Sequence, residues 1–116
     1  MSIHRHGTTP GSSHVVTHNG VLYTVAVPAT EHADIAIQTR EVLAALDGLL
    51  ARGGSDPSRI LTATVHLVHI ADSARFDHEW QRWLPDGSAP CRSCVQVAAL
   101  PREGWRIEIA LVAACD

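Results

Sequence analysis

The hydrophobic period of this chain changes from two to about 3.6 residues and back, and the order of these changes constrains its fold more than any other feature. The chain opens with two β-rich runs, 14–18 (HVVTH) and 21–27 (VLYTVAV). Asn19 and Gly20 separate them, and this pair favours a two-residue turn in which both residues need positive φ. The pattern therefore predicts a β-hairpin.

The pattern then becomes helical and returns to alternation. Apolar residues recur at helical spacing before Gly53 and Gly54, which predicts a helix over about 31–52. The next segment, DPSRILTATVHLVHI, begins with turn residues and then alternates, which predicts a strand covered on one side. We expect its covered side chains to be Leu61, Ala63, Val65 and Leu67, with Thr62, Thr64 and His66 on the other face.

A second helix and two further strands complete the order. The helix lies in ADSARFDHEWQRWLP, with Asp72 or Ser73 as its cap and its aromatic residues on one stripe. Strands follow at about 91–99 and 104–114. The order β-β-α-β-α-β-β predicts an α+β fold, a single domain over 1–116 with one mixed sheet and two helices on one face.

Alternation divides the side chains of the last two strands into two sets. We expect the first set to face the helices: Ser93, Val95, Val97, Ile107, Ile109 and Leu111. We expect the second set on the opposite face, beside Thr62, Thr64 and His66: Arg92, Cys94, Gln96, Arg106, Glu108 and Ala110. That face is neither apolar nor freely charged, which is typical of a surface covered by another subunit, so we expect an oligomer.

Composition argues against several classes of function. The formal charge is −3 and the nine Lys and Arg residues are all arginines, scattered along the chain, whereas nucleic acid or anionic membrane partners need clustered basic residues. No apolar run approaches the roughly 18 residues of a membrane span, and no signal-peptide core is visible, so we expect a cytoplasmic protein. Three cysteines without such a signal do not indicate a disulfide framework.

The cysteines and histidines match no recognised ligand set. The segment from Cys91 to Cys94 fits C-x-x-C formally, but it enters a strand, where residues three apart point to opposite faces, and a zinc site needs four ligands. The eight histidines show no metal-binding spacing. Nucleotide and serine-hydrolase motifs such as G-x-G-x-x-G and G-x-S-x-G are absent, so we expect no cofactor and no metal.

Arg92 is the residue that most needs a partner. A guanidinium on the covered side of a sheet must satisfy its donors, and its planar shape fits a carboxylate bidentately. Two explanations stay open. One is a structural ion pair, for example with Glu108, and the other is the carboxylate of a ligand at a subunit interface.

Four segments resemble one known family, in order and with the right spacing. They are HNGVLYT, then ADIAIQTREVLAALDGLLARGGSDPSRILTATVHL, then the P-x-R-S-C-V-Q-V run over 90–97, and the closing RIEIALVAA. Over about 15–114 the chain resembles the RidA/YjgF family. The resemblance implies a chorismate-mutase-like α+β fold that assembles as a homotrimer, with the sheets lining a central barrel and ligand clefts between adjacent subunits.

The resemblance also implies a reaction. Studied members of the family hydrolyse reactive enamines and imines, such as 2-aminoacrylate, to 2-oxo acids and ammonia. The residue matching Arg92 binds the substrate carboxylate there, and backbone groups around the position of Cys94 place the imine. We therefore expect Arg92, Cys94 and Glu108 as catalytic residues. The expected substrate-binding residues are Arg92, Ser93, Cys94, Asp77, Tyr23, Thr24 and His14.

Departures from the family pattern leave two functions open. The family's last strand often reads E-I-E, but here Ala110 follows Glu108 and Ile109, so a methyl group replaces the carboxylate that orients water. The G-P-Y-S and S-G-Q elements are replaced by SSHVV and TVA, and a common asparagine of the second helix aligns with Asp77, as in divergent members. The chain is thus predicted to be an imine or enamine deaminase or, as the alternative, a non-catalytic protein that binds or senses a small carboxylate. For an enzyme, the candidates for proton transfer are His14, His66, Asp77 and Glu108.

Overall fold

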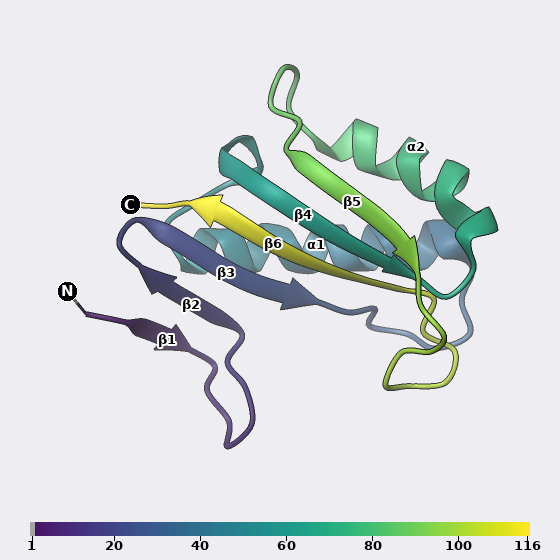
Figure 1. Cartoon of the computed structure of the whole chain (residues 1–116), viewed down its shortest axis with the longest axis horizontal. Helices are drawn as coiled ribbons and strands as arrows, with labels where there is room; N and C mark the ends of the chain where they lie inside the picture. The colour runs from purple at the N-terminus through teal and green to yellow at the C-terminus, as the bar shows by residue number, and fades with distance from the viewer. Residues whose placement is uncertain (1) are drawn as a thin grey trace.

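The structure, a computed structural model that describes residues 2–116, contains one six-stranded sheet in the order β1-β2-β3-β6-β4-β5 (Figure 1). Only β4 and β5 pair in parallel, so the predicted mixed sheet is confirmed. The strands and α-helices in chain order are β1 (His4–His6), β2 (Val15–His18), β3 (Val21–Ala26), α1 (Ile35–Arg52), β4 (Ile60–Leu67), α2 (Ser73–Trp83), β5 (Cys91–Gln96) and β6 (Ile107–Ala114).

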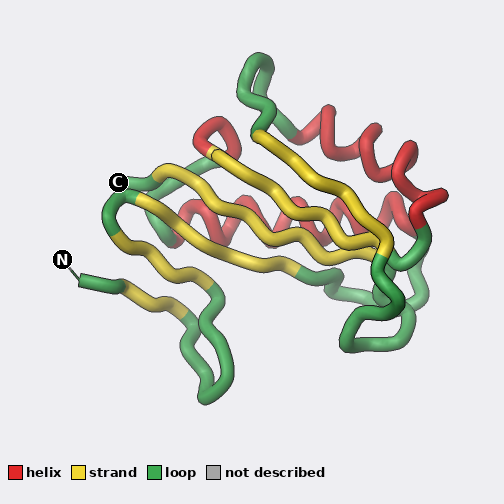
Figure 2. Tube along the Cα trace, in the orientation of Figure 1, coloured by secondary structure: helices red, strands yellow, loops and turns green. Residues whose placement is uncertain are grey.

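The predicted hairpin is present between β2 and β3. Asn19 and Gly20 have φ values of 54° and 75°, as the two-residue turn requires, and His18 pairs with Val21. The short strand β1, which pairs antiparallel with β2, was not predicted. Its three residues, HRH, carry no apolar alternation, and Figure 2 shows that a long loop separates it from β2.

The first helix is shorter than predicted because its cap lies later in the chain. Asp34 has extended backbone, and its side chain accepts a hydrogen bond from the Ile37 N–H at 2.9 Å. That hydrogen bond is also the main reason that the pKa of Asp34 lies below its ordinary value. The helix therefore begins at Ile35 and ends at Arg52, with Gly53 following it as predicted.

The last strand also begins later than predicted. Arg106 precedes β6, and its guanidinium donates to both carboxylate oxygens of Asp72, at 3.1 and 3.2 Å. Its backbone N–H donates to the Gln38 side chain at 2.8 Å. Asp72 occupies the cap position of α2 as predicted, but its carboxylate binds Arg106 and makes no capping hydrogen bond. Arg106 is therefore not on the face of the sheet opposite the helices, where the alternation predicted it.

Both helices pack on one face of the sheet, and the other face, here called the open face, is uncovered in Figure 1. A cation–carboxylate pair, Arg40 Nη2 and Glu79 Oε1 at 3.0 Å, joins α1 to α2. The core between the layers is mainly aliphatic. Its largest fully buried apolar side chains are Phe76, Leu22, Ile35, Leu46, Leu50, Leu67, Ile107, Ile109 and Leu111.

The predicted faces of β5 are wrong. Parallel pairing places Arg92 beside Ala63 and Cys94 beside Val65, and paired residues share a face, so Arg92 and Cys94 lie on the helix side. Ser93 and Val95 lie on the open face. The alternation gave the wrong faces because β5 is an edge strand whose side chains are mostly polar. Its aliphatic residue, Val95, therefore does not mark the side that faces the core.

The prediction for Leu61 is wrong for a different reason. The register of β4 against β6 shifts between Ile60 and Thr62, so Leu61 is an inserted residue that leaves the alternation. It is 49% exposed, whereas Ile60 is buried. From Thr62 onward, β4 has the predicted faces. Within residues 2–116, no helix has the length and apolar character required to cross a bilayer.

We expect Leu46→Ala to lower the free energy of unfolding by about 2–5 kcal/mol, because this side chain is fully buried between α1 and the sheet. Ile37→Ala is the matched control, since Ile37 is on the same helix and 43% exposed. This variant should change the free energy of unfolding by less than about 0.5 kcal/mol. Urea unfolding of the two variants measures both values. Equal losses would contradict the proposed packing of α1.

Candidate functional site

The candidate site lies at the free edge of β5, where α2 passes alongside it. Arg92 Nη1 donates to Asp77 Oδ1 at 2.6 Å. The guanidinium carbon lies 5.3 Å from the centre of the Phe76 ring and 5.9 Å from that of Trp80. Two aromatic rings and one carboxylate therefore hold the cation in place.

The partner of Arg92 is Asp77 and not Glu108, which answers part of the question left open by the sequence. Among residues 2–116, Nη1 is the only guanidinium nitrogen of Arg92 that donates a hydrogen bond, so Nε and Nη2 remain available. The Arg92 side chain is 27% exposed and that of Asp77 35%. A partly exposed pair of this kind adds little to stability, so Asp77 can share Arg92 with a ligand at small cost to the fold.

Cys94 lies on the same face, two residues from Arg92, and packs against the core. Burial is the main cause that raises the pKa of its thiol, and the Asp77 charge acts in the same direction, while Arg92 opposes both. The thiol is therefore protonated at neutral pH and is a poor nucleophile. Its role is to shape the site beside Arg92.

Three other predicted site residues lie on the open face, across the sheet from Arg92. Glu108 is 3.3 Å from His66, measured from Oε1 to Nδ1. Ser93 pairs with Thr64, and Tyr23, which is 49% exposed, lies on β3. Glu108 therefore cannot reach a ligand held by Arg92 of the same protomer.

The last two predicted residues lie away from β5, since Thr24 is on β3 and His14 precedes β2. Thr24 is buried, and its Oγ1 donates to the backbone oxygen of His14 at 2.7 Å. The imidazole of His14 borders a groove of about 590 Å³ between β3 and α1. The other residues that line this groove are Val25, Ala26, Val27, Ala45, Gly48, Leu49 and Arg52. Since β6 and β4 separate β3 from β5, one protomer does not bring His14 to Arg92.

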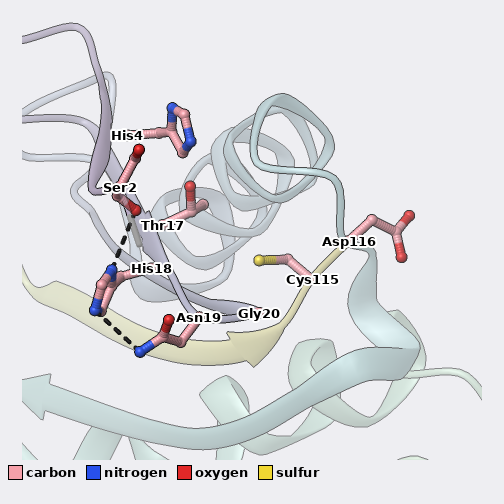
Figure 3. Close-up of a pocket in the computed structure, with 8 residues that line it drawn as sticks. All are labelled: Ser2, His4, Thr17, His18, Asn19, Gly20, Cys115 and Asp116. Atoms are coloured by element: carbon pink, nitrogen blue, oxygen red, sulfur yellow. Dashed lines mark hydrogen bonds between the residues drawn. The ribbon is translucent and has the colours of Figure 1, made fainter.

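A smaller hollow of about 270 Å³ lies beside the β2–β3 turn and contains two histidines (Figure 3). His18 is satisfied by the protein itself. The Asn19 amide donates to its Nε2 at 3.0 Å, and its Nδ1 donates to the backbone oxygen of Ser2 at 3.1 Å. Across residues 2–116, no three His, Cys, Asp or Glu side chains are grouped so that they could hold a metal ion.

The aromatic support of Arg92 was not predicted. Phe76 and Trp80 were predicted to lie on one aromatic stripe of the helix, but a buried stripe gives no sign that a cation rests against it. The available signal was the position of Asp77 between them on α2, one residue from Phe76.

Comparisons with known proteins agree on one family. The family model described as Endoribonuclease L-PSP matches residues 4–115. The RutC family protein YoaB of Escherichia coli is 41% identical over 102 residues, which cover 88% of this chain and 89% of YoaB. A RutC family protein of Haemophilus ducreyi is 37% identical over 105 residues, which cover 90% of this chain and 89% of that protein.

A crystal structure gives the same result for the fold. A member of the YjgF protein family from Neisseria meningitidis superposes with a TM-score of 0.94 and 38% identity. The superposition covers 100% of this chain and 97% of that one. The sheet, the helices and their order are therefore those of this family.

The proximity of Cys94 to Asp77 gives a prediction for a variant in which Cys91 and Cys115 are replaced by serine. Alkylation of Cys94 should become fast only above the pH typical of an exposed thiol, because the pKa is raised. Adding Asp77→Asn should move the midpoint of the rate–pH curve downward, because it removes a charge that raises this pKa. Iodoacetamide labelling followed by mass spectrometry measures the curve, and an unchanged midpoint would show that the two groups do not interact.

Proposed function

This chain belongs to the RidA/YjgF family, and from that premise we propose that it hydrolyses small 2-imino or enamino acids to 2-oxo acids and ammonia. Arg92 binds the substrate carboxylate, and Cys94 and the backbone around it shape the space for the imine. The reaction takes place at a cleft that a neighbouring subunit completes. We place the protein in the cytoplasm, where its three free cysteines suit a reducing environment.

The observation that carries this proposal is the state of Arg92. Its cation rests against two aromatic rings and uses one nitrogen for Asp77, which leaves Nε and Nη2 for a ligand. The side chain is partly exposed, so a ligand can reach it from the solvent side. A fixed, partly exposed guanidinium with free donors is well suited to a small carboxylate.

The chemistry requires little from the protein. An imine carbon is already electrophilic, so water adds to the C=N bond, and the resulting carbinolamine loses ammonia to leave a 2-oxo acid. Holding the carboxylate fixes the position of this carbon, and orientation alone can accelerate such a step. The charges around Arg92 are arranged before the substrate arrives, which lowers the cost of reorganisation.

We propose that the assembly is a homotrimer whose sheets face one another. The open face exposes apolar side chains that water does not favour, among them Tyr23, Val25 and Val95, which are 47–53% exposed. In addition, β5 pairs with β4 alone, so its outer edge has unpaired backbone groups beside Arg92. Both features favour a second copy of the chain next to the site.

The alternative, binding of a small carboxylate without turnover, is favoured by one residue. Ala110 occupies the position where the family often has a glutamate, and it lies on the open face between Val25 and Thr64. Its methyl group cannot orient water or accept a proton. The name of the matching family model mentions an endoribonuclease, but a formal charge of −3 without lysine does not favour RNA as a substrate.

The hydrolase proposal predicts that the protein accelerates release of 2-oxo acid from imines produced by an amino-acid oxidase. Arg92→Ala should lower this acceleration by about 10- to 150-fold, because charge-assisted hydrogen bonds to the carboxylate are lost. Arg75→Ala, which removes an exposed arginine of α2, is the matched control and should change nothing. Absence of acceleration by stoichiometric wild-type protein would reject the hydrolase and leave the binding alternative.

The assembly can be tested by light scattering. The wild-type mass should be about three times the 12.5 kDa of one chain. Val95→Asp should dissociate the assembly, since it places a charge on the open face, whereas Ile37→Asp on the exposed side of α1 should leave it intact. A monomeric wild type would contradict the proposed trimer.

A further inference from the structure

We infer that Asp77 makes the Arg92 site selective for molecules that carry a positively charged nitrogen next to their carboxylate. Such molecules are iminium acids and amino acids, and the site discriminates against 2-oxo acids of the same size. The inference rests on the proposed function only in that a ligand carboxylate binds Arg92. It applies whether or not the bound molecule is hydrolysed.

The charge of Asp77 favours such a ligand. Asp77 places a carboxylate in direct contact with the only side chain proposed to bind the ligand's carboxylate, at 2.6 Å. A ligand that carries only a negative charge would bring two like charges together around one guanidinium, which is unfavourable. A ligand nitrogen with a positive charge removes this repulsion and becomes a partner for Asp77.

The free hydrogen-bonding groups of Arg92 and Asp77 also match such a ligand. Within residues 2–116, Asp77 Oδ1 accepts from Arg92 and Oδ2 has no hydrogen bond. The pair thus offers donors, Arg92 Nε and Nη2, and an acceptor, Asp77 Oδ2. In an amino or iminium acid, one carbon atom separates the carboxylate from the nitrogen, so a small ligand can meet both groups together.

The surrounding groups do not supply a competing charge. Cys94 stays protonated because its pKa is raised, and Phe76 and Trp80 are apolar. Glu108 and His66 lie on the other face of the sheet. Asp77 is therefore the acidic group of this protomer that a molecule on Arg92 meets.

The proposed reaction gives this selectivity a use. An iminium acid and water yield a 2-oxo acid and an ammonium ion, so the nitrogen that Asp77 contacts leaves during the reaction. The remaining product carries only a negative charge, and no positive charge on it offsets its repulsion by Asp77. The site thus favours the substrate over its product, and repulsion assists product release.

Calorimetric titration with two ligands of one carbon skeleton tests the inference. The ligands are 2-aminobutanoate, a stable substitute for the iminium acid, and 2-oxobutanoate. We expect the wild type to bind the amino acid more tightly. Asp77→Asn should weaken binding of the amino acid and strengthen binding of the 2-oxo acid. The ratio of the two affinities then changes by about tenfold or more and inverts.

Two controls accompany the titration. Asp86→Asn removes the same charge from an exposed loop position and should leave the affinity ratio unchanged. Arg92→Gln should abolish the binding of both ligands. Thermal unfolding of each variant shows whether it is folded at the temperature of the titration.

Each other outcome overturns the inference. If Asp77→Asn weakens the binding of both ligands, Asp77 has a structural role. If Asp77→Asn strengthens the binding of both ligands equally, Asp77 only competes with them for Arg92. A wild type that prefers the 2-oxo acid, or binds neither ligand, also overturns it. Failure of the proposed function gives a different result. If the protein does not hydrolyse imines, the ratio of the two affinities still inverts between the wild type and Asp77→Asn.

Discussion

The parallel pairing of β5 with β4 decides the side of the sheet on which Arg92 lies, and the candidate site depends on that side. If β5 were shifted by one residue, Arg92 would lie on the open face, away from α2. The observed register places it opposite Ala63, over Phe76 and Trp80 and within reach of Asp77. One backbone register therefore supplies the aromatic support, the acidic neighbour and the remaining free donors together.

The sequence predicted the elements well where local physics decides them. The Asn19-Gly20 turn, the helical spacing before Gly53 and the alternation of β4 all have local causes, and the structure agrees with them. Predictions from the sequence failed where a distant strand decides the face on which a side chain lies. Leu61 leaves the pattern because β6 imposes a shifted register, and Arg92 changes side because β4, not its own neighbours, orients β5.

The same distinction applies to the site. Arg92 could be recognised from the sequence as a cation in need of an anion, but its partner could not, because the ion pair considered was with Glu108 and the strand order was not yet known. The resemblance to the RidA/YjgF family pointed to Asp77 as a substrate-binding residue in the place of a common asparagine, and not as a partner of Arg92. The structure adds that Asp77 touches Arg92, while Glu108, Ser93 and Tyr23 lie across the sheet and His14 lies three strands away.

Phe76 and Trp80 are both part of the hydrophobic core and the support of the cation. A mutation of either ring would damage folding and ligand recognition at once, so selection for stability also preserves the anchor. Asp77 faces water on one side and carries no core packing, so it can be exchanged at low cost to the fold. Evolution can therefore alter ligand preference through α2 by a single residue while the anchor beneath it stays constant.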